Sequence, residues 1–486
     1  MYKKGGCMKN KKIFPLSSFL MFLFVNAFCF EPVATCDLLL SYIENDNSIK
    51  ENAINLQKAS LSLDSAKINN GFDITLSTGN FTIKLDEENS NISLKPTVEA
   101  KIPQVSNLSL SASSNLVSEK NDFVANDTKL SLSVDLISSS NMERQITLLK
   151  AQRTLEEAQR KLKNQAVICE KSFYTELKSI LNAIDSIISL QKTLYTNKID
   201  FQTIKTQGYS TSSSTYRLAQ MKILSTEHEI EDAVHSLIHS YIVFYKKCGY
   251  DISTLAQNID ANFDFYTLIP QDITEVEPID IHNFSEDLYT EVESSLWTYK
   301  INSMQRKSQS NFSLAANGGF TLNNSTTGST TIDAGLSSTI GGLTLGAGVS
   351  VPFSQNTASP AVTFIASLSP NKYKLNSITK QTNNLTEQEE LLAIENAREN
   401  FETAVVEYEQ TLNNLRWTKQ SGEESYEMYK NLELDLEKWY KEGFVTESEY
   451  YSAKVNAQSY YVKNIINTIE FIIYNDNIVT MFVEEK

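Results

Sequence analysis

The fold is decided by residues 207–216, QGYSTSSSTY, which return about 235 residues later as residues 442–451, EGFVTESEYY. Glycine, an aromatic residue, threonine, serine and tyrosine fall at matching positions of the two stretches. Each copy lies between a very long helical pattern and a shorter one, and each long pattern follows a segment that alternates like β-strand. An internal repeat of this kind outweighs local propensity. The sequence therefore predicts a duplicated unit of short helix, strands, long helix, glycine turn and return helix.

The composition excludes several classes of protein. The 486-residue chain carries 59 acidic and 43 basic side chains, a formal net charge of −16. Because a nucleic-acid-binding face must neutralise phosphates, this balance argues against a nucleic-acid partner. Only 9 Pro and 16 Gly suit long, uninterrupted helices. The motifs of serine hydrolases, zinc proteases and P-loop proteins are absent from the sequence, so we expect no enzyme, no cofactor and no metal.

The N-terminus has the pattern of a secretory signal. A basic stretch from Lys9 to Lys12 precedes an apolar run at residues 19–25, and small residues follow it. We expect residues 1–29 to be a signal peptide, with a membrane anchor as the alternative. A faint lipobox ends at Cys36, beyond the apolar run. Because no later segment approaches about 20 continuous apolar residues, we expect membrane insertion of the exported chain only as a closed β-barrel.

The first repeat is expected at residues 30–249. Helical spacing predicts a first helix at residues 33–69, a long helix at 141–207 and a return helix at 211–248. At 1.5 Å per residue, a helix of about 65 residues is a rod of about 100 Å. Its apolar residues recur at heptad-type spacing, which predicts a coiled-coil or helical-barrel seam: Phe173, Leu177, Ile180, Ile184, Ile187 and Leu194.

The second repeat is expected at residues 284–486. A short helix at 284–309 is followed by a long helix at 372–441 and a return helix at 446–482. Residues 250–283 are acidic, irregular and contain two prolines, which is typical of a linker between the repeats. In each half, two short helices stacked end to end match one long helix, so we expect them to build a uniform cylinder wall.

Before each long helix the period changes to two. Residues 72–137 and 311–369 alternate apolar residues with Ser, Thr and Asn, as in LSLSV at residues 130–134. This is the pattern of strands with two different faces. In an exported protein it fits barrel strands with a lipid face and a watery face, with up to four strands in each half. A soluble β-sandwich is the alternative.

The glycine stretches resemble the TolC-like outer-membrane efflux family. The resemblance lies in residues 440–450, YKEGFVTESEY, followed by Ala453, Ala457 and a helix reaching Tyr474-Asn475. Residues 207–216 and the Cys-Gly-Tyr at 248–250 are its first-half version. In architecture the resemblance covers essentially the whole mature chain; at the residue level it is confined to these segments.

The resemblance implies a mainly α fold with β. Duplicated coiled-coil hairpins form a trimeric α-helical tunnel joined to a shared transmembrane β-barrel, located in the outer membrane with a periplasmic extension. It implies a passive exit duct of an efflux or secretion system, working as a homotrimer with a periplasmic adaptor and an inner-membrane pump. The tip turns that would touch the adaptor are Gly208, Tyr209, Ser210, Gly443, Phe444 and Val445.

Acidic residues after the second turn have two interpretations. The resemblance implies that Glu449, with Glu447 beside it, lines the tunnel entrance, where threefold symmetry would make a carboxylate ring and raise its pKa by mutual repulsion. The alternative is a solvated helix N-terminus, where carboxylates interact favourably with the helix dipole. The sequence departs from the family at Ser214, which matches Glu449 in the first half, and at Val445, where a polar or basic residue is usual.

One further constellation is three histidines on the first return helix. With Asp232, they lie on one helical face, since 4, 7 and 11 residues return to nearly the same azimuth. His-x3-His can bind a divalent metal; the alternative is a polar face of a tunnel helix. The histidines are His228, His235 and His239.

Two other functions remain open from the sequence. A trimeric coiled-coil surface adhesin or stalk would need a C-terminal anchor of strands, whereas helical patterning continues to residue 482. A periplasmic adaptor has one coiled-coil hairpin and soluble β domains, whereas this chain has two equivalent hairpins. The sequence does not identify the exported substrate.

Overall fold

The computed structural model describes residues 34–79, 81–85, 90–119, 122–251, 264–309, 312–323, 330–353 and 359–484. The signal peptide expected at residues 1–29 lies outside them. The chain forms two compact units, a helical unit and a sheet unit, each combining segments of both repeats. The helical unit is residues 1–53, 160–290 and 400–486, and the sheet unit is residues 54–159 and 291–399.

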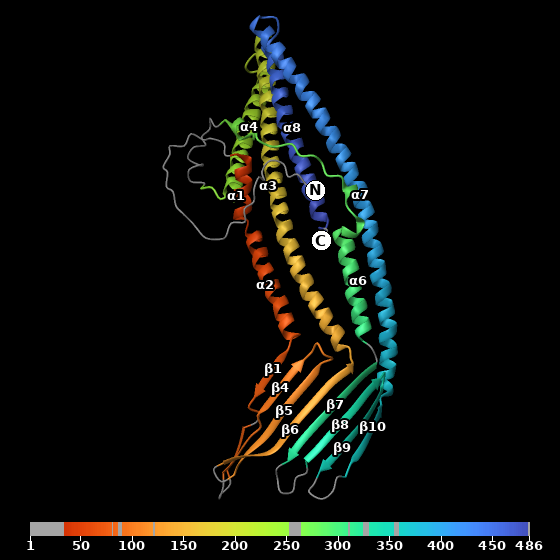
Figure 1. Cartoon of the computed structure of the whole chain (residues 1–486). Coiled ribbons are helices and arrows are strands. Elements are labelled where there is room, and N and C mark those ends of the chain that lie inside the picture. Colours follow the sequence, from red (N-terminus) through yellow and green to blue (C-terminus); the bar gives the residue numbers. More distant parts are fainter. Residues whose placement is uncertain are drawn as a thin grey trace. The chain divides into compact units, whose positions relative to one another are not determined.

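The sheet unit holds a ten-stranded antiparallel sheet. Its main path runs β1-β4-β5-β6-β7-β8-β9-β10, with a β2–β3 hairpin beside it (Figure 1). The first repeat supplies β1 (Asp73–Ser77), β2 (Phe81–Leu85), β3 (Ser90–Leu94), β4 (Thr97–Ile102), β5 (Leu108–Glu119) and β6 (Asp122–Ile137). The second repeat supplies β7 (Phe312–Asn323), β8 (Thr330–Ile340), β9 (Leu343–Phe353) and β10 (Ala361–Leu368).

The ten strands occupy only eight positions in the sheet. β3 and β4 both pair with β5, one after the other, so they share one position. β1 pairs with β4 and β2 pairs with β3, so these two share the next position. Gly79 lies between β1 and β2 with φ of 64°, a left-handed conformation that suits glycine and interrupts the strand. Each repeat thus supplies four positions, within the number expected from the sequence.

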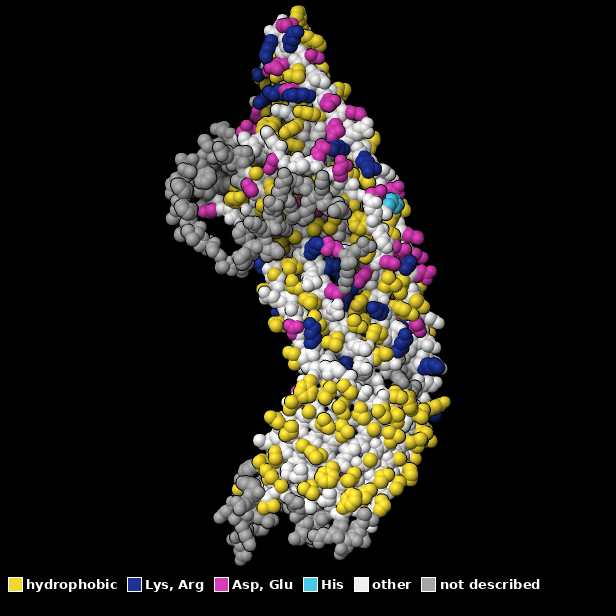
Figure 2. All heavy atoms as spheres, viewed as in Figure 1, with side chains coloured by type: hydrophobic (Ala, Val, Ile, Leu, Met, Phe, Trp, Pro, Cys, Tyr) yellow, Lys and Arg dark blue, Asp and Glu magenta, His cyan; other side chains and the backbone are white. Residues whose placement is uncertain are grey.

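The sheet has one apolar and one polar face. Leu110 pairs with Leu132 on one face, and the next residues, Ser111 and Ser131, pair on the other. The same alternation crosses every neighbouring pair on the main path. Hydrophobic side chains gather over the strands in Figure 2. The large exposed side chains of the apolar face include Val98, Leu110, Leu130, Leu132, Ile332, Leu336, Val349 and Phe364.

The sheet is open. In the described part of the chain, β1 pairs only with β4 and β2 pairs only with β3 at one end of the sheet. At the other end, β10 pairs only with β9. Every residue of β1 and of β10 is exposed. The closed barrel that the sequence predicts as shared among copies is therefore not shown in the single chain, because among the described residues the outer sides of both end strands lack a neighbouring strand.

The helices follow the repeat predicted from the sequence, with one difference. The helix expected at residues 33–69 is divided at Asp46, whose carboxylate accepts a hydrogen bond from the Ile49 N–H at 2.9 Å and so caps a second helix. The helices are α1 (Thr35–Asn45), α2 (Asn47–Asn69), α3 (Ser140–Thr206), α4 (Ser214–Lys247), α6 (Thr290–Ser308), α7 (Pro370–Lys441) and α8 (Glu447–Met481).

In the helical unit, four helices form one layer in the order α4-α3-α8-α7 (Figure 1). Asn197 of α3 donates a hydrogen bond to Thr226 of α4. On its other side, α3 meets α8 through the ion pair of Lys178 with Glu470 at 2.7 Å. α8 in turn meets α7, where the rings of two tyrosines stack at 5.3 Å. α4 and α7 are thus the two edges of the layer.

The core of the helical unit follows the heptad-type spacing of α3. Phe173, Leu177, Ile180, Ile184 and Ile187 are buried, whereas Leu194 is only partly so. They pack with buried residues of the neighbouring helices and of α1. These partners include Leu38, Tyr42, Leu237, Phe244, Val462 and Ile469.

The described part of the linker, from residue 264, packs on this core. The 3-10 turn η1 (Phe265–Leu268) buries Phe265, and η2 (Ile281–Asn283) buries Ile281. A third turn, η3 (Glu286–Leu288), follows the linker. Asp272 accepts hydrogen bonds from both the backbone N–H and the hydroxyl of Thr35, at 2.7 and 2.5 Å. The linker thereby caps the first helix of the described chain with a carboxylate.

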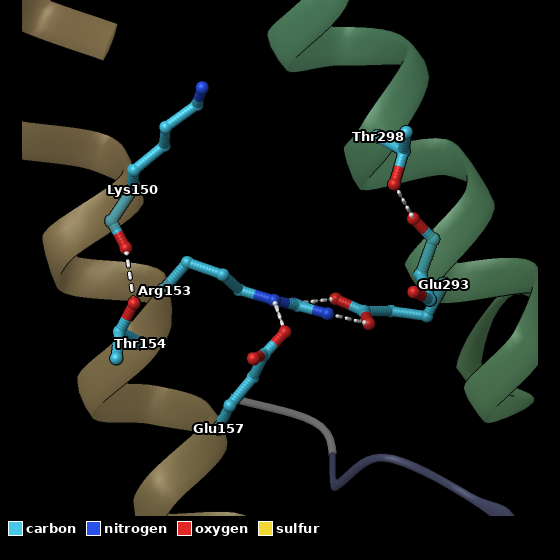
Figure 3. Close-up of polar contacts among 7 residues, drawn as sticks. Lys150, Arg153, Thr154, Glu157, Glu293 and Thr298 are labelled. Carbon is cyan, nitrogen blue, oxygen red and sulfur yellow. Dashed lines mark hydrogen bonds and ion pairs between the residues drawn. The ribbon is translucent and has the colours of Figure 1, made fainter. Parts of the chain in front are cut away.

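A buried arginine joins the two repeats within the sheet unit. Arg153 of α3 reaches across to α6, where its guanidinium donates two hydrogen bonds to Glu293 (Figure 3). Its Nε donates to Glu157 at 2.8 Å, and its guanidinium lies 5.3 Å from the Trp297 ring centroid. Glu293 holds the pKa of Arg153 above its ordinary value. This charge is fully partnered, as a buried charge must be.

Candidate functional site

The two chain reversals of the helical unit are built alike. Gly208 and Gly443 have φ of 77° and 79°, which glycine adopts without steric cost. The Gly443 N–H donates to the Tyr440 carbonyl at 3.0 Å, and the Phe444 N–H donates to the Trp439 carbonyl at 2.8 Å. The equivalent pair of bonds closes the helix before Gly208. Both long helices therefore end in a Schellman motif.

Each reversal leads into a capped helix, but the two differ in length. Ser213 caps α4 by accepting from the Tyr216 N–H at 3.2 Å, and Thr446 caps α8 by accepting from the Glu449 N–H at 3.3 Å. The cap follows the glycine by five residues in the first reversal and by three in the second. Tyr216, and not Ser214 as the sequence match indicated, therefore occupies the helical position of Glu449.

Glu449 closes a capping box. Its carboxylate accepts hydrogen bonds from the Thr446 N–H and hydroxyl, both at 2.8 Å. The backbone hydrogen bond, and then the hydroxyl bond, lower the pKa of Glu449 below its ordinary value. In the single chain this carboxylate thus has the local helix-terminus role that was the alternative interpretation. A carboxylate ring with raised pKa would need other copies and stays a prediction.

The reversals present exposed aromatic side chains. Phe444 is 77% exposed and Tyr209 is 46% exposed. Among the described residues, no hydrogen bond, ion pair or ring contact joins the two turns to each other. Behind them, Tyr195 of α3 packs on Tyr451 of α8 with ring centroids 4.2 Å apart. The turns are therefore projecting loops on a rigid aromatic base.

The second candidate surface is the two-faced sheet. On its polar face, hydroxyls bond across strands: Ser111 with Ser131 at 2.6 Å, and Ser350 with Asp333 at 2.6 Å. On its apolar face, Leu132 and Leu336 remain 42% and 48% exposed. A contiguous exposed apolar surface of this kind marks contact with a membrane or another protein.

Two family models match the chain in sequence order. The TP096X N-terminal domain matches residues 38–273, and the TP096X C-terminal domain matches residues 274–485. The chain matches the TP096X family in both of its domains. No curated protein matches the sequence. The two TP096X domains meet inside the linker, and each contains one long helix and one glycine reversal.

Solved structures of outer-membrane proteins are similar to this chain. VceC of Vibrio cholerae is 12% identical, with 93% of this chain and 97% of that chain covered and a TM-score of 0.49. The open state of MtrE of Neisseria gonorrhoeae is 12% identical over 94% and 95%, with a TM-score of 0.48. CmeC of Campylobacter jejuni is 12% identical over 97% and 96%, with a TM-score of 0.45. Because each TM-score is below 0.5, these similarities alone support no functional conclusion for this chain.

The histidines of the N-terminal TP096X domain lie on the surface. His228, His235 and His239 are exposed on α4, and so is Asp232. Within the described residues, no three His, Cys, Asp or Glu side chains are placed to hold a metal ion together. Nor does any described helix combine the length and apolar character that a membrane crossing needs.

A buried carboxylate lies in the C-terminal TP096X domain. Asp476 of α8 is 8% exposed, and its Oδ2 has no hydrogen-bond partner in the described part of the chain. Burial, and then the nearby Glu170, raise the pKa of Asp476 to about 8. The folded chain therefore holds a proton that the unfolded chain releases near pH 4.

Replacing this carboxylate has an expected pH signature. Since the pKa is raised on folding, the free energy of unfolding falls as pH rises from about 4 to about 8. We expect Asp476→Asn to remove this fall, so that the variant exceeds the original chain by up to a few kcal/mol at pH 8 and by much less at pH 4. Thermal unfolding of both proteins across this range measures the difference. A difference that is constant with pH would contradict the buried neutral acid.

Proposed function

We propose that this chain is the outer-membrane exit duct of a multi-component efflux or secretion system, a homotrimer that conducts substrates passively from the periplasm to the exterior. The observation that carries the proposal is the open, two-faced sheet. A sheet with an exposed apolar face and two unpaired end strands tends to associate with other molecules. The unpaired backbone groups can bond to another strand, and the apolar face can contact lipid or protein.

Copies of the chain complete the sheet by joining end to end. The outer side of β10 in one copy pairs with the outer side of β1 in the next, and a ring of such contacts closes without leaving an edge. The apolar face then meets lipid, and the face of hydroxyls and glycines lines water, as in transmembrane barrels. The long strands β5 to β9, of 11 to 16 residues, reach the length of about 9–11 residues that a tilted spanning strand needs.

The number of strands sets the width of the duct. Eight positions in each of three copies amount to 24 positions around one barrel. Barrels of 16–18 strands already leave an aqueous channel. A trimer therefore encloses a wide, water-filled lumen, which suits bulky cargo or a variety of cargo and leaves selection to the partners.

The reversals are the proposed docking end. Phe444 and Tyr209 project from turns with no packing role in the chain, so a partner can bind them without disturbing the core. We assign the periplasmic adaptor to this surface, with an inner-membrane pump as the source of energy. Glu447 and Glu449 would then surround the tunnel entrance. The adaptor contacts are Gly208, Tyr209, Ser210, Gly443, Phe444 and Val445.

Cysteine crosslinking tests the closed ring. Thr75 of β1 and Thr363 of β10 lie on the polar face of the two end strands. In membranes, the variant Thr75→Cys/Thr363→Cys, treated with a bifunctional maleimide, is expected to give covalent dimers and trimers and nothing larger. The matched control replaces Thr321 of β7, which has strands on both sides, instead of Thr363, and should stay monomeric.

The adaptor and stalk alternatives predict different crosslinked products. Open-ended ladders would indicate fibres instead of a ring, and monomers alone would contradict the duct and favour an adaptor-like protein. A trimer whose crosslinks form without any membrane would favour the stalk.

A further inference from the structure

The two edges of the helical layer expose different chemistry. α4 packs on α3 through one face and exposes the opposite one; α7 does the same against α8. The exposed face of α7 repeats every eleven residues, just over three helical turns. It carries Val406, Trp417, Met428 and Trp439, with Glu424 and Asp435 between them. The exposed face of α4 carries Leu218, Met221, Leu224, His228, Asp232, His235 and His239.

In the proposed ring, the α7 edge of one copy lies beside the α4 edge of the next. The inference that follows therefore rests on the proposed function. In a ring with rotational symmetry, the α7 edge of one copy contacts the α4 edge of the next, and equivalent residues stay at the same height. Both edges are apolar near the reversals: Leu218 and Met221 are 60% and 64% exposed, and Trp439 is exposed opposite them. No described residue of the same chain buries this surface.

Ring contacts within the layer set the relative heights of the two edges. Tyr216 of α4 packs on Phe201 of α3, Tyr195 of α3 packs on Tyr451 of α8, and Tyr450 of α8 stacks on Tyr440 of α7. These contacts give a common scale at 1.5 Å per residue along each helix.

On this scale the three histidines of α4 overlap in height with two acids of α7 in the next copy. The stretch from His228 to His239 lies beside the stretch from Asp435 to Glu424. We propose that His228, His235 and His239 face Asp435 and Glu424 across the seam between copies, so that mild acid tightens the ring and neutral to alkaline pH loosens it.

The charges around the seam agree with a ring that is tighter in acid. Acid favours the cationic form of a histidine side chain, which is attracted to a carboxylate opposite it. At neutral to alkaline pH, Asp232 of α4 faces Asp435 and Glu424 with no intervening cation, and like charges repel. From the packed helix α3, Lys198 pairs at 3.0 Å with Glu227, which precedes His228 on α4. On α4 itself, the exposed Glu231 lies one turn from both His228 and His235. Lys438 of α7 lies nearer the reversals, beside the apolar part of the seam.

Dissociation of the detergent-solubilised ring at pH 5.5 and 7.5, followed by native mass spectrometry, tests the seam. Because each exposed histidine–carboxylate contact is weak, we expect dissociation to be roughly tenfold slower at pH 5.5 than at pH 7.5. His228→Gln/His235→Gln/His239→Gln should remove the pH effect, and Glu424→Gln/Asp435→Asn should do the same. The matched controls are His282→Gln, in the linker, and Glu427→Gln, on α7 but turned about 60° from Glu424; both should keep it.

The outcomes separate the seam from the duct. A ring with the same dissociation rate at both pH values, or a pH effect that survives the triple histidine variant, overturns the histidine seam and leaves the duct standing. A protein that is monomeric at every pH overturns the duct and the seam together.

Discussion

Leu132→Arg/Leu336→Arg is expected to abolish insertion into lipid bilayers while leaving the chain folded. Both side chains lie on the apolar face of the sheet, and each is nearly half exposed. An arginine at the middle of a barrel's lipid face costs about 2–4 kcal/mol, so two per chain make the inserted state unfavourable in every copy. Flotation of the protein with vesicles measures the inserted fraction.

The neighbouring residues provide the matched control. Ser133→Arg/Ser337→Arg introduces the same charges one residue further along β6 and β8, on the polar face. This variant should insert like the original protein, because its arginines face water. Equal loss of insertion in both variants would mean that the two faces do not separate lipid from water.

Arg153→Met is expected to lower the free energy of unfolding of the sheet unit by about 3–5 kcal/mol. The change removes the bidentate guanidinium from the Glu293 carboxylate of α6, whose side chain is 23% exposed. Thermal unfolding of the solubilised protein, followed by circular dichroism, measures the loss.

Two further variants show whether the pair itself is responsible. Lys150→Met changes a lysine one turn earlier on α3, whose side chain does not reach Glu293 (Figure 3), and should cost little. Arg153→Met/Glu293→Met removes both charges and should recover much of the stability. A double variant as unstable as Arg153→Met alone would assign the effect to lost packing on Trp297.

The reversals could be predicted from the sequence because they rest on local chemistry. Gly208 and Gly443 end helices whose apolar period runs unbroken up to them, and Thr446 with Glu449 three residues later is a readable capping box. The two-faced strands could likewise be predicted from alternation such as that of Leu130 to Val134. These signals need only a few neighbouring residues.

The remaining features depend on contacts between distant residues. Alignment on the glycines placed Ser214 opposite Glu449, whereas capping places Tyr216 there, because the first turn is two residues longer. The pairing of Arg153 with Glu293 and of Asp272 with Thr35 joins residues more than 100 positions apart. The open edges of the sheet are a property of its topology, which alternation within single strands does not reveal.

Single-particle electron microscopy of the detergent-solubilised mature protein tests the central claim most directly. The proposed duct predicts a threefold, hollow cylinder in which β10 of each copy pairs with β1 of the next and each copy contributes eight strand positions to one continuous barrel. A monomer with an open sheet, or a stalk without a lumen, would contradict it.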